Sequence, residues 1–350
     1  MPKTLHIGPY ALRNAVLLAP MAGVADAPFR AAAWRLGAGL TVAEMAASRE
    51  LLKGRQLPRL AGEDIGQRPN MVQLAGHDAQ MMASAAALAL EHGAQVIDIN
   101  MGCPARLVTG KLSGAALMRE PRVALDITRA VWRVAQDAGA PVTVKMRLGW
   151  DETTLNAPQL AVMLADAGVA MITVHGRTRA QFYNGRANWR AVGEVRRALT
   201  RAGHESLPLI VNGDITDAAS ARAALAQSGA DGVMIGRAAM GRPWLPGEIA
   251  ARLAPGSGIA PLPPARQVRE ILALHRHMTA FHGPARGVRR ARKHLKAALA
   301  HWQAQGWLPP RHARQMRELL LRAEDAAMIH DQLARLAQTA PHATRQTEHA

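Results

Sequence analysis

Eight short apolar runs, each rich in Val and Ile, recur along the first 236 residues of the chain. They lie at residues 15–19, 40–44, 70–75, 95–100, 141–146, 171–176, 208–213 and 231–236. Nearly continuous apolar runs of this length are typical of parallel strands buried on both faces, whereas half-exposed strands alternate polar and apolar residues. The runs therefore predict a parallel sheet inside an α/β structure.

Ala-rich stretches with helical periodicity separate most of these runs. Two of them, residues 81–94 and 217–230, contain a glycine at the point where a helix is expected to stop. Eight strands that alternate with helices over about 240 residues fit a (β/α)8 TIM barrel. A doubly wound sheet is the alternative, but no Gly-x-Gly-x-x-Gly motif follows the first run to support it.

The composition changes near residue 253. Residues 253–264 read LAPGSGIAPLPP, and such a Pro- and Gly-rich stretch predicts a linker. Residues 265–338 carry helical patterns without strand-like runs, and residues 339–350 resemble a disordered tail. We therefore expect a barrel domain over residues 1–252, a linker, an all-helical domain and a tail.

Polar residues and glycines collect where the apolar runs end. In a (β/α)8 barrel the carboxyl ends of the strands build the active site, so residues there are candidates for function. The candidates are Pro20, Met21, Ala22, Glu44, Gln73, Asn100, Cys103, Lys145, Arg147, His175, Arg177, Asn212, Gly213, Asp214, Gly236 and Arg237. Agreement across so many runs favours a functional site over ordinary loop polarity.

The loops after the last two runs predict a phosphate-binding site. Barrels commonly bind phosphate there, and Gly213 and Gly236 let backbone N–H groups approach an anion closely. Arg237 adds a charged donor, and no P-loop motif occurs elsewhere. Lys145 lies within an apolar run, where it is either a rim lysine that reaches solvent or a cation for an anionic cofactor ring.

Composition narrows the classes of partner. Cys103 is the only cysteine, so an internal disulfide is excluded and a structural zinc or iron–sulfur site lacks thiolates. The formal net charge of +17 favours an anionic partner, nucleic acid first, unless it only reflects a composition rich in Arg and Ala. The first apolar run breaks at Pro20, so we expect no signal peptide, no membrane span and a cytoplasmic protein.

Two further groups of residues are weaker candidates for a site. His275, His277 and His282 share one predicted helix, but the segment is basic and has no carboxylate nearby, so we expect solvated positions and no metal. Asp98 and Asp214 could form an acid–base pair, although nothing in the sequence fixes their separation.

Nine collinear segments resemble those of the tRNA-dihydrouridine synthases, in particular the bacterial B-type branch. They run from about residue 6 to about residue 300: LAPMAGVADAPFR, GAGLTVAEM, VQLAG, GAQVIDINMGCPA, VTVKMRLGW, ITVHGRTRAQFYNG, VNGDITD, GADGVMIGRAAMGRPW and ARKHL. One departure occurs at Leu107, where the B-type pattern has a second basic residue after Cys-Pro-Ala. Arg106 keeps the first basic residue, and Lys111 is retained.

The resemblance implies an FMN-binding barrel and a helical domain that together bind folded tRNA. It implies reduction of the C5–C6 double bond of one D-loop uridine, with NADPH as reductant, and it points to position 17. FMN would be held by Pro20, Met21, Ala22, Gln73, Lys145, His175, Asn212, Gly213, Asp214, Gly236 and Arg237. Cys103 would be the catalytic acid, and Asn100, Arg106, Lys111, Arg147, Arg177, Arg292 and Lys293 would contact the tRNA.

The chemistry of uridine agrees with these roles. Because the C5–C6 bond is conjugated to the C4 carbonyl, a hydride should add at C6, and a proton must then reach C5 from an acid on the opposite face. A free cysteine is mostly protonated at neutral pH, which suits Cys103 to that role better than to attack as a nucleophile. The target uridine must leave its stacked surroundings to reach the flavin.

The helical segment carries a separate signal for nucleic acid. Between Ile271 and Arg317 there is no Asp or Glu. Its Lys and Arg residues include Arg276, Arg286, Arg289, Arg290, Arg292, Lys293, Lys296, Arg311, Arg314 and Arg317. A solvated helix face normally mixes both signs of charge, so this run favours phosphate contacts.

Two other functions stay open. One is an FMN barrel that reduces or oxidises a small molecule, like the dihydroorotate dehydrogenases, although the basic helical segment argues against it. The other is a non-catalytic tRNA-binding protein, against which the cysteine and the flavin-binding set argue. We expect the protein to be a monomer.

Overall fold

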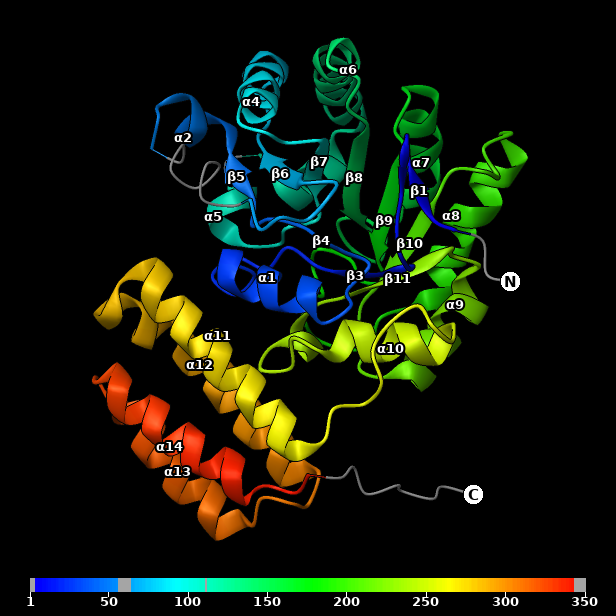
Figure 1. Cartoon of the computed structure of the whole chain (residues 1–350). Coiled ribbons are helices and arrows are strands. Elements are labelled where there is room, and N and C mark those ends of the chain that lie inside the picture. Colours follow the sequence, from blue (N-terminus) through cyan, green and yellow to red (C-terminus); the bar gives the residue numbers. More distant parts are fainter. Residues whose placement is uncertain (1–3, 56–63, 111, 343–350) are drawn as a thin grey trace.

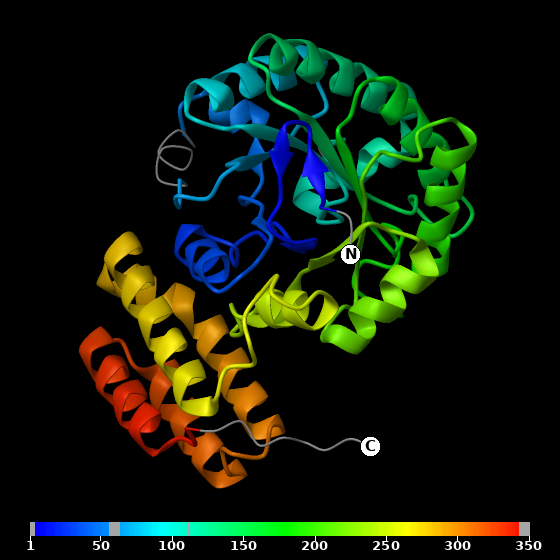
Figure 2. The same cartoon turned by 45° about the vertical axis from the view of Figure 1, so that its right-hand side comes forward.

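The computed structural model describes residues 4–55, 64–110 and 112–342. Parallel strands form a ring enclosed by helices, and a group of four helices packs beside that ring (Figure 1, Figure 2). The predicted fold class, a (β/α)8 barrel with an all-helical C-terminal part, is confirmed.

The barrel strands follow the predicted runs in order. They are β3 (Val16–Leu18), β4 (Leu40–Thr41), β5 (Ala46–Ala47), β6 (Met71–Ala75), β7 (Val96–Met101), β8 (Val142–Arg147), β9 (Met171–His175), β10 (Leu209–Asn212) and β11 (Gly232–Ile235). All pairs between them are parallel: β3 pairs with β4, the strands from β5 to β11 pair in order along the chain, and β11 pairs with β3. Parallel strands covered by helices bury both faces, which explains their continuous apolar runs.

The second barrel strand is split, which the sequence did not predict. β4 pairs with β3 and β5 pairs with β6, while the residues between them leave the ladder. A parallel bridge between Val42 and Met71 joins the two edges of the sheet. The ring is therefore closed, and a closed ring has no strand edge left to pair with another chain.

Helices cover the outside of the ring. The longer ones are α1 (Ala27–Arg35), α4 (Ala79–Glu91), α6 (Pro121–Asp137), α7 (Ala157–Asp166), α8 (Trp189–Arg201), α9 (Ala218–Ser228) and α10 (Leu245–Leu253). Shorter ones are α2 (Ser48–Leu52), α5 (Arg106–Thr109) and the 3-10 helices η1 (Gly114–Arg119) and η2 (Arg237–Ala239). Asp78 and Asp217 cap α4 and α9 by accepting a backbone N–H, and Gly229 ends α9 in the left-handed conformation, as predicted.

A short N-terminal hairpin closes one end of the barrel. β1 (His6–Ile7) pairs antiparallel with β2 (Tyr10–Ala11). The buried side chains of Leu5, Ile7 and Leu12 form one apolar cluster with residues at the amino ends of the strands, such as Val96 and Met171. This hairpin was not predicted, because its strands are too short to show a period.

Four helices form the C-terminal part: α11 (Pro264–His282), α12 (Pro284–Ala304), α13 (Pro310–Arg322) and α14 (Ala326–Thr339). α11 packs against α12 and α14, and α12 packs against α13. The helices begin and end within one residue of the predicted range, 265–338. The domain boundaries themselves stay a prediction, and most of the predicted tail lies outside the described residues.

The helical part contacts the barrel mainly through α1 and the loop before it. Asp26 accepts the backbone N–H of Phe29 at the start of α1 and also faces His282 of α11, whose Nε2 lies 2.8 Å away. Both side chains are buried. Lys293 of α12 donates to the carbonyl of Gly23, and His294 packs on the ring of Phe29 with centroids 4.6 Å apart.

Gly241 provides a test of this interface. Its φ is +70°, and an added Cβ would lie 2.5 Å from the backbone nitrogen of Ala298 and 2.6 Å from the carbonyl oxygen of His294. Gly203 is a matched control, because its φ is +82° and nothing lies within 4 Å of the added atom. Both changes to alanine strain the backbone, but only Gly241→Ala must push α12 away from the barrel.

We expect Gly241→Ala to lower the stability by about 1–3 kcal/mol more than Gly203→Ala does, because of the clash. Thermal unfolding of both variants measures the difference. Equal unfolding temperatures for the two variants would contradict the described contact between α12 and the barrel.

Candidate active site

A cavity of about 670 Å³ opens at the carboxyl ends of the strands. Eleven residues predicted to hold the cofactor line it without exception: Pro20, Met21, Ala22, Gln73, Lys145, His175, Asn212, Gly213, Asp214, Gly236 and Arg237. Cys103, Asn100 and Arg147 line it as well. The closed ring brings these residues together, because the carboxyl ends of parallel strands meet at one rim.

Cys103 lies in the loop that follows β7, at the wall of the cavity. Its thiol is free and half-buried. Its backbone N–H donates to Asn100 Oδ1 at 2.9 Å, and its carbonyl accepts the N–H of Ala115 at 3.0 Å. The loop is therefore held from both sides, which gives the thiol a defined position beside the cavity.

Lys145 projects from β8 into the cavity, close to Asn212. Its Nζ donates to Asn212 Oδ1 at 3.1 Å, and the Asn212 amide nitrogen in turn donates to the carbonyl of Met234 at 2.7 Å. Burial and, to a smaller extent, the nearby Arg147 lower the pKa of Lys145 to about 8. Among the residues that the structure describes, no carboxylate lies within hydrogen-bonding distance of this ammonium group, so a bound anion would stabilise its charge.

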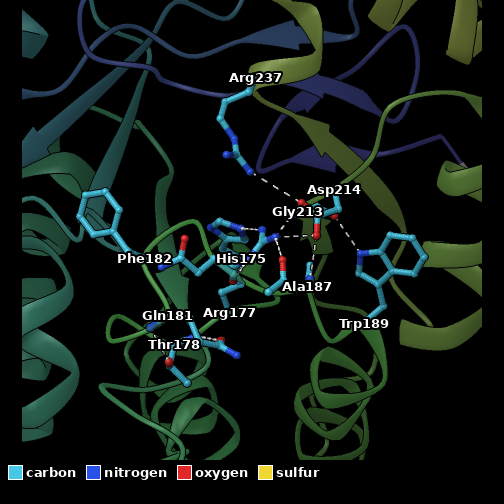
Figure 3. Close-up of polar contacts among 12 residues, drawn as sticks. His175, Arg177, Thr178, Gln181, Phe182, Ala187, Trp189, Gly213, Asp214 and Arg237 are labelled. Atoms are coloured by element: carbon cyan, nitrogen blue, oxygen red, sulfur yellow. Dashed lines mark hydrogen bonds and ion pairs between the residues drawn. The ribbon is translucent and has the colours of Figure 1, made fainter.

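His175, Arg177 and Asp214 form a cluster at the ends of β9 and β10 (Figure 3). Arg177 donates from one nitrogen to both carboxylate oxygens of Asp214, at 2.9 and 2.7 Å. Asp214 also accepts the backbone N–H of Ala187 at 2.8 Å. The pKa of His175 is lowered well below its usual value, first by burial and then by Lys145 and the neighbouring arginines, so the imidazole is neutral at physiological pH.

Gly213 cannot be replaced without moving this cluster. Its φ is +114°, and an added Cβ would lie 2.7 Å from Cδ2 of His175. Its carbonyl accepts the indole N–H of Trp189 at 2.9 Å, a contact drawn in Figure 3. The backbone thus passes close to the imidazole, which leaves no room for a side chain at this position.

Two arginines predicted to contact the substrate are bound to the protein itself. Arg147 donates to the carbonyls of Gly102, Thr178 and Phe182 at 2.8, 2.8 and 2.9 Å. Arg177 is 2% exposed, is absent from the cavity lining and also donates to loop carbonyls. Their roles in substrate binding stay predictions, and their contacts in the structure hold the loops around the cavity.

Three other predicted tRNA contacts, Arg106, Arg292 and Lys293, are not among the residues that line the cavity. Arg106 is exposed on α5. Arg292 donates to the carbonyl of Ala323 at 3.2 Å, and Lys293 donates to that of Gly23. Lys111 lies outside the described residues. Leu107, the departure from the B-type pattern, is 86% exposed.

Several residues of the cavity were missed. Met45, Ala238 and Met240 line it but are apolar, so no polar signal marked them, and the polar Thr216 lines it as well. Tyr183 lines it too, and the guanidinium carbon of Arg237 lies 4.7 Å from the centre of its ring. The chain has only two tyrosines, and one of them follows the sixth predicted strand, so this residue could have been found.

Glu44 was the predicted candidate on the second strand, and the structure corrects that choice. Its side chain is buried and does not belong to the cavity lining, whereas Met45 does. The reason is the split of that strand, which changes the residue that faces the rim. Asp98 and Asp214 have separate partners and form no acid–base pair, since Asp98 is bonded to Gln73 and Thr143.

The prediction that the α11 histidines are simply solvated was wrong for two of them. His275 is buried, its Nδ1 lies 2.9 Å from Nε2 of His330, and burial lowers its pKa to about 4. His282 meets Asp26 across the interface. Within the described parts of the chain, no group of three His, Cys, Asp or Glu is arranged to hold a metal ion. Nor is any helix there long and apolar enough to cross a bilayer.

The fold is shared with solved oxidoreductases at low sequence identity. A morphinone reductase in complex with tetrahydroNAD matches with a TM-score of 0.53 and 18% identity, over 74% of this chain and 94% of its own. The 6-hydroxypseudooxynicotine amine oxidase of Pseudomonas geniculata matches with a TM-score of 0.55 and 15% identity, over 72% and 49%. At this identity the likeness shows the barrel fold alone.

Sequence comparison gives the family. The dihydrouridine synthase family model matches residues 17–339. A probable tRNA-dihydrouridine synthase of Rhizobium leguminosarum is 46% identical over 326 residues, which cover 91% of this chain and 98% of that protein. The tRNA-dihydrouridine synthase B of Escherichia coli K12 is 44% identical over 294 residues, covering 83% and 88%. The chain therefore belongs to the dihydrouridine synthase family and groups there with the bacterial B-type proteins.

Proposed function

We propose that this protein is a tRNA-dihydrouridine synthase that reduces the C5–C6 bond of a D-loop uridine, at position 17, with FMN as cofactor and NADPH as reductant. The observation that carries the proposal is one cavity in which a free thiol, Cys103, faces a cluster of cations, in a chain of this family. Related proteins from several bacteria carry the name tRNA-dihydrouridine synthase. We place the protein in the cytoplasm and expect it to act as a monomer.

The cavity suits FMN in size and in charge. Its volume of about 670 Å³ lies within the usual range for cofactor sites. Lys145, Arg147 and Arg237 bring positive charge to its wall, whereas Asp214 is already paired with Arg177. Gly213 and Gly236 would let backbone N–H groups approach the phosphate, and Lys145 with neutral His175 would contact the ring system. Bound FMN supplies the hydride.

Cys103 would then supply the proton. The thiol stands at the cavity wall, and its loop is fixed by Asn100 and by Ala115. Placed across the uridine ring from the hydride source, it can protonate C5 as charge develops there. Arg147, which donates to the carbonyls of Gly102 and Phe182, would hold these two loops in place around a bound uridine.

The helical part would hold the body of the tRNA. Seven of the ten basic residues that the sequence singled out between 271 and 317 are exposed: Arg276, Arg286, Arg289, Lys296, Arg311, Arg314 and Arg317. Lys293 of α12 donates to the carbonyl of Gly23, and the neighbours of Gly23 in that loop line the cavity. This concentration of exposed positive charge favours tRNA over a small molecule as the substrate.

Loss of the gene should remove dihydrouridine at one D-loop position. Mapping of dihydrouridine in bulk tRNA from the deletion strain measures this. Wild-type protein should restore the modification, and Cys103→Ala should not, because the proton donor is gone. If the modification is unchanged at every position, or if Cys103→Ala restores it fully, the proposed chemistry is wrong. A protein that binds tRNA but never contains a reducible flavin would favour the non-catalytic alternative.

Affinity for tRNA should fall steeply with salt, by about tenfold or more between 50 and 200 mM, because each neutralised phosphate releases counterions. Arg314→Glu with Arg317→Glu on α13 should weaken binding and flatten that slope. Arg190→Glu with Arg201→Glu is the matched control, since these arginines are exposed on α8 of the barrel. Equal affinity for both double variants in a filter-binding assay would argue against α13 as a tRNA contact.

Affinity for FMN should depend on the charge of Lys145. Its pKa of about 8 in the free cavity means that the ammonium is present below that pH and is lost above it. Binding of an anion raises this pKa, so affinity should fall by up to about tenfold per pH unit above pH 8. Lys145→Met should weaken FMN binding at pH 7 and abolish this dependence, whereas exposed Lys53→Met should change neither, as measured by flavin fluorescence.

A further inference from the structure

A chain of hydrogen bonds runs from a buried carboxylate to the Cys103 loop. Asp98 Oδ2 accepts Nε2 of Gln73 at 2.6 Å, and Gln73 Oε1 accepts Nδ2 of Asn100 at 2.8 Å. Asn100 Oδ1 then accepts the backbone N–H groups of Gly102 at 3.1 Å and of Cys103 at 2.9 Å. The chain begins inside the barrel and ends at the loop that carries the thiol.

The two ends of this chain have fixed polarity. A backbone N–H only donates, so Asn100 must present its oxygen to Gly102 and Cys103. An ionised carboxylate only accepts, so Gln73 must present its nitrogen to Asp98. In a side-chain amide the oxygen and the nitrogen could trade places by a rotation. For Gln73 and Asn100, however, only one pair of orientations satisfies both Asp98 and the backbone N–H groups.

Asp98 is suited to act as the fixed acceptor. Its side chain is 2% exposed, and in the sheet it stands beside Gln73 of β6 and Thr143 of β8. Thr143 donates its hydroxyl to the second carboxylate oxygen at 2.6 Å. Burial raises the pKa of Asp98 to about 6, and these hydrogen bonds and Lys145 oppose that rise, so the carboxylate is charged at pH 7.5.

A buried carboxylate needs a reason, because burial of a charge is costly and an apolar side chain would pack at that position as well. Asp98 does not line the cavity. Its contacts lead instead, through two amides, to the two backbone N–H groups beside the thiol.

We propose that Asp98 is a positioning residue: it fixes the orientation of the Gln73 and Asn100 amides and so holds the Gly102–Cys103 backbone where the thiol faces the substrate. This inference rests on the proposed function, in which Cys103 is the proton donor. Asp98 itself touches neither substrate nor cofactor.

The variant Asp98→Asn tests the fixed polarity with little change in shape. The amide of an asparagine has an oxygen that accepts and a nitrogen that donates, so either atom can face Gln73. The Thr143 hydroxyl can donate or accept, so it can bond to the other atom in both cases. In the reversed arrangement Asn100 would point its nitrogen at the N–H of Cys103, and that hydrogen bond is lost. The matched control is Thr143→Val, which removes the other partner of Asp98 but leaves the carboxylate bonded to Gln73.

Hydrogen exchange of the Gly102 and Cys103 amides gives a readout that does not need a bound cofactor. We expect about tenfold faster exchange in Asp98→Asn than in the wild type and in Thr143→Val, because local opening becomes easier. In the double variant Asp98→Asn with Gln73→Glu, residue 73 again accepts from Asn100, and protection should return. Unchanged exchange in Asp98→Asn, or no recovery in the double variant, overturns the inference.

The oxidative half-reaction gives a second readout. The bound flavin is reduced with dithionite and mixed with a tRNA transcript, and its return to the oxidised state is timed. Asp98→Asn should slow this step by about tenfold, since a charge-assisted hydrogen bond is lost, with unchanged tRNA affinity. In a Cys103→Ala background the same change should have no further effect, because Asp98 acts through the thiol.

The two failures are distinguishable. If the wild type makes no dihydrouridine, the proposed function fails, while the exchange experiment still decides whether Asp98 holds the loop. If the wild type is active and Asp98→Asn slows the Cys103→Ala enzyme as much as it slows the wild type, Asp98 does not act through Cys103 and the inference fails.

Discussion

Closure of the parallel sheet is the constraint on which the rest of this molecule depends. Every barrel strand is buried on both faces and must find a partner on both sides, which the chain achieves by splitting its second strand between β3 and β6. Closure fixes the register of neighbouring strands, and the register places Asp98 beside Gln73 and Thr143. The pairing of the apolar strands therefore decides which polar side chains meet inside the barrel.

The loop after the first barrel strand joins the two parts of the protein. Asp26 both starts α1 and binds His282, while the carbonyl of Gly23 accepts Lys293. Met21 and Ala22, which directly precede Gly23, line the cavity. A displacement of the helical part would therefore be felt at the cavity wall through a few short, rigid contacts.

The sequence predicted the barrel, the order of its strands and many residues of the cavity lining, because buried parallel strands have a distinct pattern and their carboxyl ends share one rim. It did not predict the split that puts Met45 at the rim in place of Glu44, since a break in a strand depends on pairing across the sheet. Nor did it show that His282 would meet Asp26, because two residues separated by most of the chain become neighbours only in the packed structure. For the same reason the sequence did not show that Arg147 and Arg177 would bond to groups of the protein itself, such as the carbonyl of Thr178 and the carboxylate of Asp214.

The cations around the cavity also bear on how the protein folds. Lys145, Arg147 and Arg237 line the cavity together, and among the described residues of that lining Asp214 alone carries a carboxylate, so the folded barrel carries mutual repulsion of like charges. An anionic ligand that binds only the folded state relieves that repulsion and, at a hundredfold excess over its Kd, adds about 2.7 kcal/mol to stability. The supply of cofactor in the cell would thus help to set how much of this protein survives as folded molecules.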